Sequence, residues 1–217
     1  MTIADLQASG TGSFRQALRR VPTQARARER VVRVLEAAVA LIERQGTDHL
    51  KMADLAKAAD ISIGSLYQYF PDKTAVVHAL AERCYQESRH CIEEGLAGIA
   101  DAAAFRAAFA QLYDIYYAQF LAEPAMADIW SGTQGDKDLR AIEIDYSREN
   151  AALLVEAVMR LAPDADRQAL TASAFLVMYL GESTMRLAVS VPREEGQVLV
   201  DDYKRMALSL LDTYLPG

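Results

Sequence analysis

The sequence has 217 residues, of which 52% are hydrophobic and 24% are charged. This balance excludes a largely disordered chain and is ordinary for a globular protein of one or two domains. No apolar run approaches the roughly 20 residues of a membrane-spanning helix, and the polar N-terminal region lacks the apolar core of a secretory signal.

The sequence contains two cysteines, Cys84 and Cys91. If one helix carries both, they lie roughly 10 Å apart along its axis. That separation is too large for a disulfide within the helix. We therefore expect reduced thiols in a cytoplasmic protein.

Charge is divided unevenly along the chain, whose net charge is −7. Residues 13–83 hold 12 Lys/Arg and 8 Asp/Glu, whereas residues 84–217 hold 11 Lys/Arg and 21 Asp/Glu. A basic segment can bind DNA while an attached acidic segment is repelled from it. The acidic total therefore does not exclude a nucleic-acid partner.

Residues 1–23 are rich in Gly, Pro and small polar residues and are predicted to form a flexible basic arm. Arg15, Arg19 and Arg20 make its second half basic. Two interpretations remain open. The segment is either a solvated tail or an arm that reaches a neighbouring groove or phosphate of DNA.

A first helix is predicted over about 24–45, because apolar residues recur on one face at helical spacing and Gly46 follows as a natural stop. The apolar stripe consists of Val32, Leu35, Val39 and Ile42. Arginines crowd the first turns, where positive charge opposes the helix dipole. They are Arg26, Arg28, Arg30 and Arg33. A nearby phosphate backbone would explain them.

A second helix is predicted over about 52–59 and a third over about 62–70, with a tight turn at Asp60 between them. Ser62 is a good N-cap, and Pro71 ends the third helix. A helical wheel gives that helix an apolar inner side formed by Ile63, Leu66 and Phe70. Its polar outer side consists of Gly64, Ser65 and Gln68, with Tyr67 and Tyr69 on the flanks.

This pair of helices is typical of a device that places one helix in the major groove of DNA. Gly64 costs about 1 kcal/mol relative to Ala inside a helix, and close approach to a phosphate or a base edge is one explanation. Ser65 and Gln68 can hydrogen-bond to bases, the two flanking tyrosines can reach phosphates or thymine methyls, and Lys73 can clamp a phosphate. The alternative is an all-helical protein-interaction module in which the motif is only structural.

The residues Asp54-Leu55-Ala56-x-x-Ala59, followed by Ile61-Ser62-x-Gly64-Ser65-Leu66-Tyr67-x-Tyr69-Phe70-x-Asp72-Lys73, resemble the helix-turn-helix signature of the tetracycline-repressor (TetR) family. The resemblance implies DNA contacts at Ser62, Gly64, Ser65, Tyr67, Tyr69 and Lys73. Two residues depart from the family pattern. Asp60 stands where the family usually has Gly, and Lys51 stands where it usually has Thr and would add a charge near the phosphates.

Helices in the rest of the chain are predicted over about 73–95, 101–121, 125–131, 137–161, 164–190 and 195–214, separated by Pro and Gly residues. The predicted fold is therefore all-α, with about nine helices. We expect a helix-turn-helix domain over residues 24–72 and a helical ligand-binding and dimerisation domain over residues 73–217, in which 73–95 is the linking helix.

The helix over 164–190 is apolar nearly all round, so it should be buried on two sides. We assign its small-residue face to a homodimer interface, with the last helix beside it, so that two copies form a four-helix bundle. The interface candidates are Ala174, Val177, Gly181, Thr184, Ala188, Tyr203, Met206 and Leu210. The alternative is the internal core of a monomer. In a dimer, two reading helices would meet half-sites about 34–36 Å apart, or a multiple of that.

An interior rich in aromatic residues and Met, with isolated polar groups, is typical of a small-molecule pocket and also of a plain helical core. The candidate lining residues are Tyr113, Tyr116, Tyr117, Met126, Trp130, Tyr146, Asn150, Phe175, Met178 and Glu182. The family resemblance favours the pocket and implies a mainly apolar effector. It also implies a repressor that binds a palindromic operator as a dimer and is released when the effector moves the linking helix.

An enzyme is the main competing class of protein. Glu87-x-x-His90 with Cys91 and Glu94 could form a helical metal site, but charged residues on an exposed helix face explain the pattern better. The sequence contains no phosphate-binding glycine loop, nucleophile elbow or Cys-x-x-Cys pair. We therefore expect no enzymatic activity, no cofactor and no metal.

Overall fold

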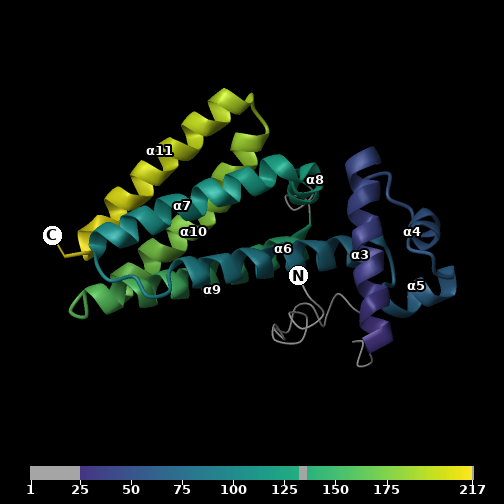
Figure 1. Cartoon of the computed structure of the whole chain (residues 1–217), viewed down its shortest axis with the longest axis horizontal. Coiled ribbons are helices and arrows are strands. Elements are labelled where there is room, and N and C mark those ends of the chain that lie inside the picture. Colours follow the sequence, from purple (N-terminus) through teal and green to yellow (C-terminus); the bar gives the residue numbers. More distant parts are fainter. Residues whose placement is uncertain (1–24, 132–135, 217) are drawn as a thin grey trace. The chain divides into compact units, whose positions relative to one another are not determined.

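The computed structural model describes residues 25–131 and 136–216 of the chain (Figure 1). Within those ranges the fold consists of nine α-helices and one short 3-10 helix, and the all-α prediction is confirmed. The helices are α3 (Ala25–Gln45), α4 (Met52–Ala58), α5 (Ile63–Tyr69), α6 (Lys73–Gly95), α7 (Ala102–Ala122), α8 (Pro124–Ser131), α9 (Lys137–Leu161), α10 (Arg167–Val189) and α11 (Arg193–Leu211), followed by η2 (Asp212–Tyr214).

The chain divides into two compact units. The first contains the described residues up to Glu87 together with Pro124–Leu139, and the second contains Ser88–Glu123 and the residues from Arg140 onward. The helix α6 therefore contributes to both units, and α8 returns from the C-terminal half of the chain to the first unit. The functional division at residues 72 and 73 stays a prediction, and the predicted arm over residues 1–23 lies outside the described residues.

The first unit has a core built by α3, α4, α5 and the first half of α6. Its buried residues include Val31, Val34, Leu35, Ala38, Ile42, Leu55, Leu66, Phe70, Val76 and Leu80. Gly46, at φ +79°, ends α3 in the left-handed conformation that suits glycine, as the sequence predicts. The helix α8 packs against α3, and both belong to this unit.

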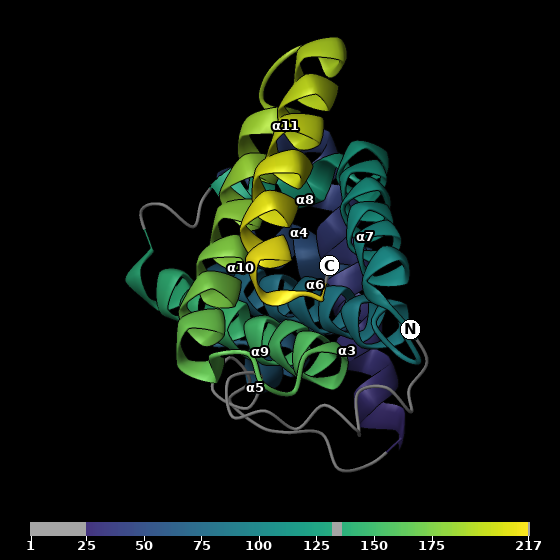
Figure 2. The ribbon, with the colours of Figure 1, turned by 90° about the vertical axis from the view of Figure 1, so that its left-hand side faces the viewer.

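The second unit is organised by a column of aromatic rings on α7. The ring of Phe109 lies 5.0 Å from that of Tyr113, which in turn lies 4.9 Å from the ring of Tyr203 on α11. The helices α10 and α11 pack against each other and against α7 (Figure 2). Within the described residues, no helix is both long enough and apolar enough to cross a bilayer.

Candidate nucleic-acid interface and effector cavity

The helix α5 is defined at both ends by the residues that the sequence singles out. The backbone N–H of Ser65 donates to the Ser62 hydroxyl oxygen at 3.1 Å, so Ser62 is the N-cap. The helix ends at Phe70, directly before Pro71. Asp72 then caps α6, accepting from the backbone N–H of Ala75 at 2.8 Å.

The turn before α5 has the hydrogen bonds of a Schellman motif. The backbone N–H of Ile61 donates to the carbonyl of Ala56 at 3.0 Å, and that of Asp60 donates to the carbonyl of Lys57 at 3.3 Å. Asp60 takes the left-handed position of this motif, with φ +52°. The chain therefore adopts the glycine-type turn of the family with an aspartate in place of the glycine.

Most of the predicted DNA-facing side of α5 is open. Ser62, Gly64, Tyr67 and Gln68 are exposed, and Ser65 is half-buried. A Cβ atom added to Gly64 would meet nothing within 4 Å among the described residues, so none of them requires glycine there. The outer side of α5 is low and uncovered, as a helix that enters a groove requires.

Two residues of α5 differ from the sequence-based prediction. Ile63, predicted on the inner side, is 44% exposed, and Tyr69, predicted to reach DNA, is only 7% exposed. Both lie about 60° from Leu66 around the helix, on opposite sides, so the pattern alone does not distinguish them. Packing places the Tyr69 side in the core of the first unit.

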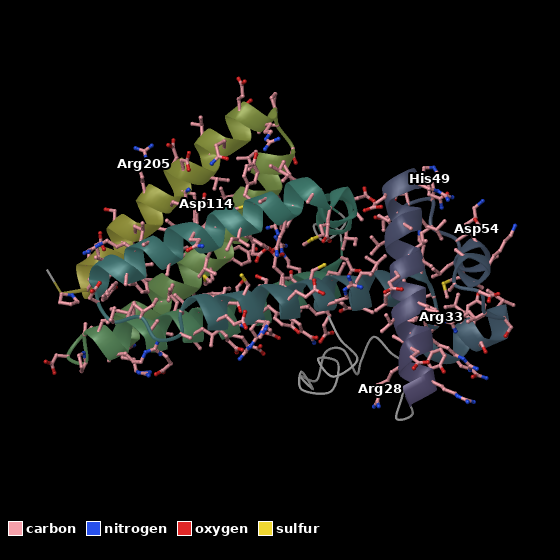
Figure 3. The ribbon with its side chains drawn as sticks, viewed as in Figure 1. Arg28, Arg33, His49, Asp54, Asp114 and Arg205 are labelled. Atoms are coloured by element: carbon pink, nitrogen blue, oxygen red, sulfur yellow. The ribbon has the colours of Figure 1, made fainter. Side chains whose placement is uncertain are left out.

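Cationic residues flank the motif along the chain. Lys51 is exposed and is the N-cap residue of α4, although its side chain makes no capping hydrogen bond. Lys73 begins α6, and its ammonium donates to the backbone carbonyl of Asp48 at 3.1 Å. Arg28 and Arg33 lie along the N-terminal half of α3 (Figure 3), and Arg33 is exposed.

A cavity in the second unit lies among α6, α7, α9 and α10. It measures about 40 Å³ as the space open to the centre of a water molecule, which is room for a few waters at most. Five predicted lining residues border it: Tyr113, Tyr116, Asn150, Met178 and Glu182. Nine other residues that line the cavity were not predicted from the sequence: Ser88, Cys91, Ile92, Leu96, Phe109, Leu112, Gln119, Ser147 and Leu154. The spacing of Ser88, Cys91 and Ile92 along one face of the linking helix was the signal that could have found part of this set.

The other predicted pocket residues do not border this cavity. Tyr117 is buried and donates to the carbonyl of Arg193 at 3.4 Å, and Tyr146 is buried elsewhere. The ring of Phe175 packs under the Arg148 guanidinium at 5.3 Å. Met126 lies on α8 in the first unit, and the side chain of Trp130 lies outside the described part of the structure.

A carboxyl group lies at the edge of the cavity. The Tyr116 hydroxyl donates to Glu182 Oε2 at 2.7 Å. Burial raises the pKa of Glu182 to about 7, although the Tyr116 hydrogen bond and the positive charge of Arg186 oppose the increase. Glu182 therefore exchanges its proton near neutral pH.

The prediction of a dimer interface is wrong for most of the residues assigned to it. Ala174, Val177, Gly181, Ala188 and Tyr203 are buried inside the single chain. A Cβ atom added to Gly181 would collide with the Tyr113 ring, so the small residues serve close packing of α10 against α7. Thr184 and Leu210 are half-buried, and Met206 is 56% exposed.

The Glu87-x-x-His90 pattern does not form a cluster suited to a metal. His90 Nε2 lies 3.3 Å from Glu94 Oε1 on the exposed face of α6. Across residues 25–131 and 136–216, no three His, Cys, Asp or Glu side chains are grouped to hold an ion.

Comparison with known proteins identifies two family models. One, described as "Bacterial regulatory proteins, tetR family", matches residues 34–80, and the other, described as "Tetracyclin repressor-like, C-terminal domain", matches residues 103–215. Among curated proteins, the transcriptional repressor KstR of Mycolicibacterium smegmatis is 38% identical over 60 residues, which span 28% of each chain. The nucleoid occlusion factor SlmA of Actinobacillus pleuropneumoniae is 42% identical over 60 residues, 27% of this chain and 30% of SlmA. The chain thus matches less than a third of the length of these relatives.

Solved structures share the fold over most of the chain. A TetR-family regulator from Streptomyces coelicolor superposes with a TM-score of 0.63 at 23% identity, covering 86% of this chain and 99% of the other. The TetR-family repressor AlkX from Dietzia superposes with a TM-score of 0.61 at 17% identity, covering 86% and 98%. With the two family models, the capped α5 and the glycine-type turn, these findings show that the chain belongs to the TetR family of transcriptional regulators, which are not enzymes.

Proposed function

We propose that the protein is a repressor that binds a palindromic DNA operator as a homodimer and releases it when a small effector enters the cavity of the second unit. The observation that carries the proposal is the uncovered outer side of α5, where Gly64 has no neighbour within 4 Å of a Cβ position. A shallow capped helix lets base edges and phosphates come close.

The DNA-reading residues of the proposal are the exposed ones. Gln68, which is exposed, and Ser65, which is half-buried, can donate or accept at base edges, while Tyr67, 43% exposed, can reach a phosphate. Lys51 and Lys73 supply positive charge at the starts of α4 and α6. Tyr69 is removed from this set because its ring lies in the core.

Dimerisation is part of the proposal, on a corrected surface. Four large apolar side chains on α10 and α11 are about half exposed: Leu176, Leu187, Val198 and Met206. Exposed apolar groups of this size on two adjacent helices are typical of a protein interface. A second copy would cover them and would set the spacing of the two reading helices.

The effector response is proposed to act through α6. This helix begins at Lys73, four residues after the last residue of α5, and its later turns supply Ser88, Cys91 and Ile92 to the cavity. A ligand larger than the present space must displace the cavity walls, and α6 carries that displacement to the end of the reading motif. Binding to chromosomal DNA also requires a cytoplasmic location.

The test is selection of bound fragments from sheared genomic DNA, followed by fluorescence anisotropy on the selected duplex at several salt concentrations. We expect affinity to fall steeply with salt, because phosphate contacts release counterions. Lys73→Ala should weaken binding to all duplexes and reduce the salt slope by about 1, whereas Gln68→Ala should change sequence preference. Arg140→Ala, an exposed arginine of the second unit, is the control.

A protein that selects no duplex, or whose binding is insensitive to salt, would instead be the all-helical interaction module. In that case Lys73→Ala and Arg140→Ala would have the same negligible effect on DNA.

A further inference from the structure

The cavity of the second unit contains polar groups whose hydrogen-bonding capacity is not used. Ser147 Oγ and Asn150 Oδ1 are buried without a hydrogen-bond partner in the described part of the chain, and their residues are only 3% and 4% exposed. Leaving a buried polar atom unsatisfied costs about 1–3 kcal/mol. Since both residues line the cavity, a ligand that hydrogen-bonds to them recovers that free energy.

A carboxyl group adds negative charge to the same cavity. Glu182 is 8% exposed and borders the space, yet none of the described residues that line it is Lys, Arg or His. The nearest cation of α10, Arg186, forms an ion pair with Glu143 of α9 at 2.7 Å. The acid that faces the cavity therefore has no dedicated cation of its own among the lining residues.

The Glu143–Arg186 pair also brings the acceptors together. Ser147 lies one helical turn after Glu143 on α9, and Glu182 lies one turn before Arg186 on α10. A short connection, residues 162–166, joins the two helices. The pair thus aligns the turn of α9 that carries Ser147 with the turn of α10 that carries Glu182. Asn150 lies about one turn after Ser147 on α9 and lines the same cavity.

We infer that this cavity binds an apolar primary amine, with its ammonium group held by Glu182, Ser147 and Asn150 and its hydrocarbon part against Ile92, Phe109 and Leu154. The inference rests on the proposed function, since it specifies the effector of the same cavity. An ammonium has three donors and no acceptor, which matches the amide oxygen of Asn150 and the ionised carboxylate of Glu182, both of which only accept, and the hydroxyl oxygen of Ser147, which can accept. A buried cation also requires a paired anion, which Glu182 supplies.

The same chemistry disfavours an anionic ligand. A fatty-acid carboxylate in this cavity would meet the Glu182 carboxyl, and no lining residue offers a compensating positive charge.

Amine binding depends on the protonation of Glu182. Groups that face Glu182 come from four helices: Tyr113 and Tyr116 on α7, Glu143 on α9, Arg186 on α10 and Tyr203 on α11. Cys91 of α6 also lines the cavity, and burial raises the pKa of its thiol. The cationic ligand binds the ionised form of Glu182. Affinity should therefore rise about tenfold from pH 6 to pH 8, across a pKa of about 7.

The test uses isothermal titration calorimetry on the full chain with three probes of equal tail length: octylamine, 1-octanol and octanoate. We expect octylamine to bind at least tenfold more tightly than either of the others at pH 8. Glu182→Gln keeps the acceptor for the Tyr116 hydroxyl but removes the charge, so octylamine affinity should fall at least tenfold and lose its dependence on pH. Glu94→Gln, at an exposed glutamate of α6, is the matched control and should change neither the octylamine affinity nor its dependence on pH.

Asn150→Ala is a second variant, which removes one acceptor and leaves the carboxyl in place. It should weaken octylamine threefold to tenfold and leave 1-octanol less affected. Each of three results would overturn the inference: octanol or octanoate binding as tightly as octylamine, no octylamine binding, or unchanged octylamine affinity in Glu182→Gln.

DNA affinity measured in parallel separates the proposed ligand class from the proposed effector response. Octylamine that binds by these criteria but leaves DNA affinity unchanged supports the ligand class and contradicts the effector response.

Discussion

Asp128 of α8 accepts hydrogen bonds from both the backbone N–H and the side-chain hydroxyl of Thr47, the residue that follows Gly46 at the end of α3. The two residues are 81 positions apart in the sequence and lie in the same unit. This contact attaches the segment between α7 and α9 to the helices that carry the reading motif.

We expect Asp128→Ala to lower the free energy of unfolding by about 1–3 kcal/mol, because Thr47 loses the acceptor of two hydrogen bonds. Urea denaturation monitored by circular dichroism measures the change. Asp145→Ala is a control at an exposed aspartate of α9 whose contact is an ion pair with Arg148 three residues away. It should change stability by no more than about 0.5 kcal/mol. Equal effects of the two variants would show that the Thr47 contact does not stabilise the protein.

Asp60 offers a stabilising substitution. Its φ of +52° is a conformation that glycine adopts without the steric cost of a side chain. We expect Asp60→Gly to raise the free energy of unfolding by about 0.5–1 kcal/mol, and Asp60→Val to lower it, since β-branched residues tolerate this region poorly. Chemical denaturation of the three proteins tests whether the free energy of unfolding decreases in the order Gly, Asp, Val at residue 60. A less stable glycine variant would contradict the Schellman geometry of the turn.

Gly181 and Tyr113 should be energetically coupled. A Cβ atom at residue 181 would lie 2.8 Å from Tyr113 Cε1, and closer still to its hydroxyl oxygen. Gly181→Ala should therefore destabilise the protein by about 1–3 kcal/mol through overpacking. In the double variant Gly181→Ala with Tyr113→Phe, removal of the hydroxyl relieves part of the clash. A double-mutant cycle should then give a coupling of at least about 0.5 kcal/mol, and simple additivity would count against this contact.

The pair formed by His78 and Asp136 should make stability depend on pH. The two side chains lie 2.7 Å apart in the first unit. Burial opposes ionisation of Asp136, but hydrogen bonds from His78 and from the backbone N–H groups of Leu139 and Asp138 outweigh it and lower the pKa of Asp136. Because the folded pKa is the lower one, the stabilisation is present above the unfolded pKa of about 4 and is lost as pH falls through the folded value.

Asp136→Asn should consequently melt at a lower temperature than the wild-type protein above pH 5, and the difference should shrink as the pH falls below 4. Calorimetry over pH 3–7 measures it. A difference that persists unchanged at the acidic end would mean that Asp136 contributes by shape rather than by charge.

The corrected dimer surface makes a prediction about association. Leu187→Glu places a charge where a second copy is proposed to pack and should convert the dimer to a monomer in light scattering at micromolar concentration. Leu121→Glu on α7, where the leucine is 38% exposed, is the matched control and should leave the dimer intact. A wild-type protein that is monomeric at this concentration would remove dimerisation from the proposed function.

Local features of the fold were accessible from the sequence. Ser62, Pro71 and Gly46 act on backbone atoms within a few residues of themselves, so their capping and terminating roles follow from chemistry alone. The apolar stripe of α3 follows from helical periodicity, with Leu35 and Ile42 buried, although Val32 and Val39 are only half-buried. These features were sufficient to predict the nine described helices and the reading motif.

Tertiary structure decided which apolar and polar faces meet. The small residues of α10 were assigned to a second copy of the chain, but Gly181 packs against Tyr113 inside one copy. Ile63 and Tyr69 are equivalent on a helical wheel, and only packing in the first unit places Tyr69 inside and Ile63 outside. Periodicity identifies the side of a helix that avoids water, but not the surface that covers it.

The lining of the cavity was also predicted only in part from the sequence. The sequence alone indicated Tyr113, Tyr116, Asn150, Met178 and Glu182 as candidates, because their residue types and helical positions suit an interior. It could not indicate Ser147, nor the alignment of α9 with α10 through Glu143 and Arg186, since that contact joins residues 43 positions apart. The sequence by itself determined the helices, their caps and the reading motif, which depend on neighbours along the chain. The chemistry of the cavity depends on side chains brought together from four helices, and only the packed structure decided it.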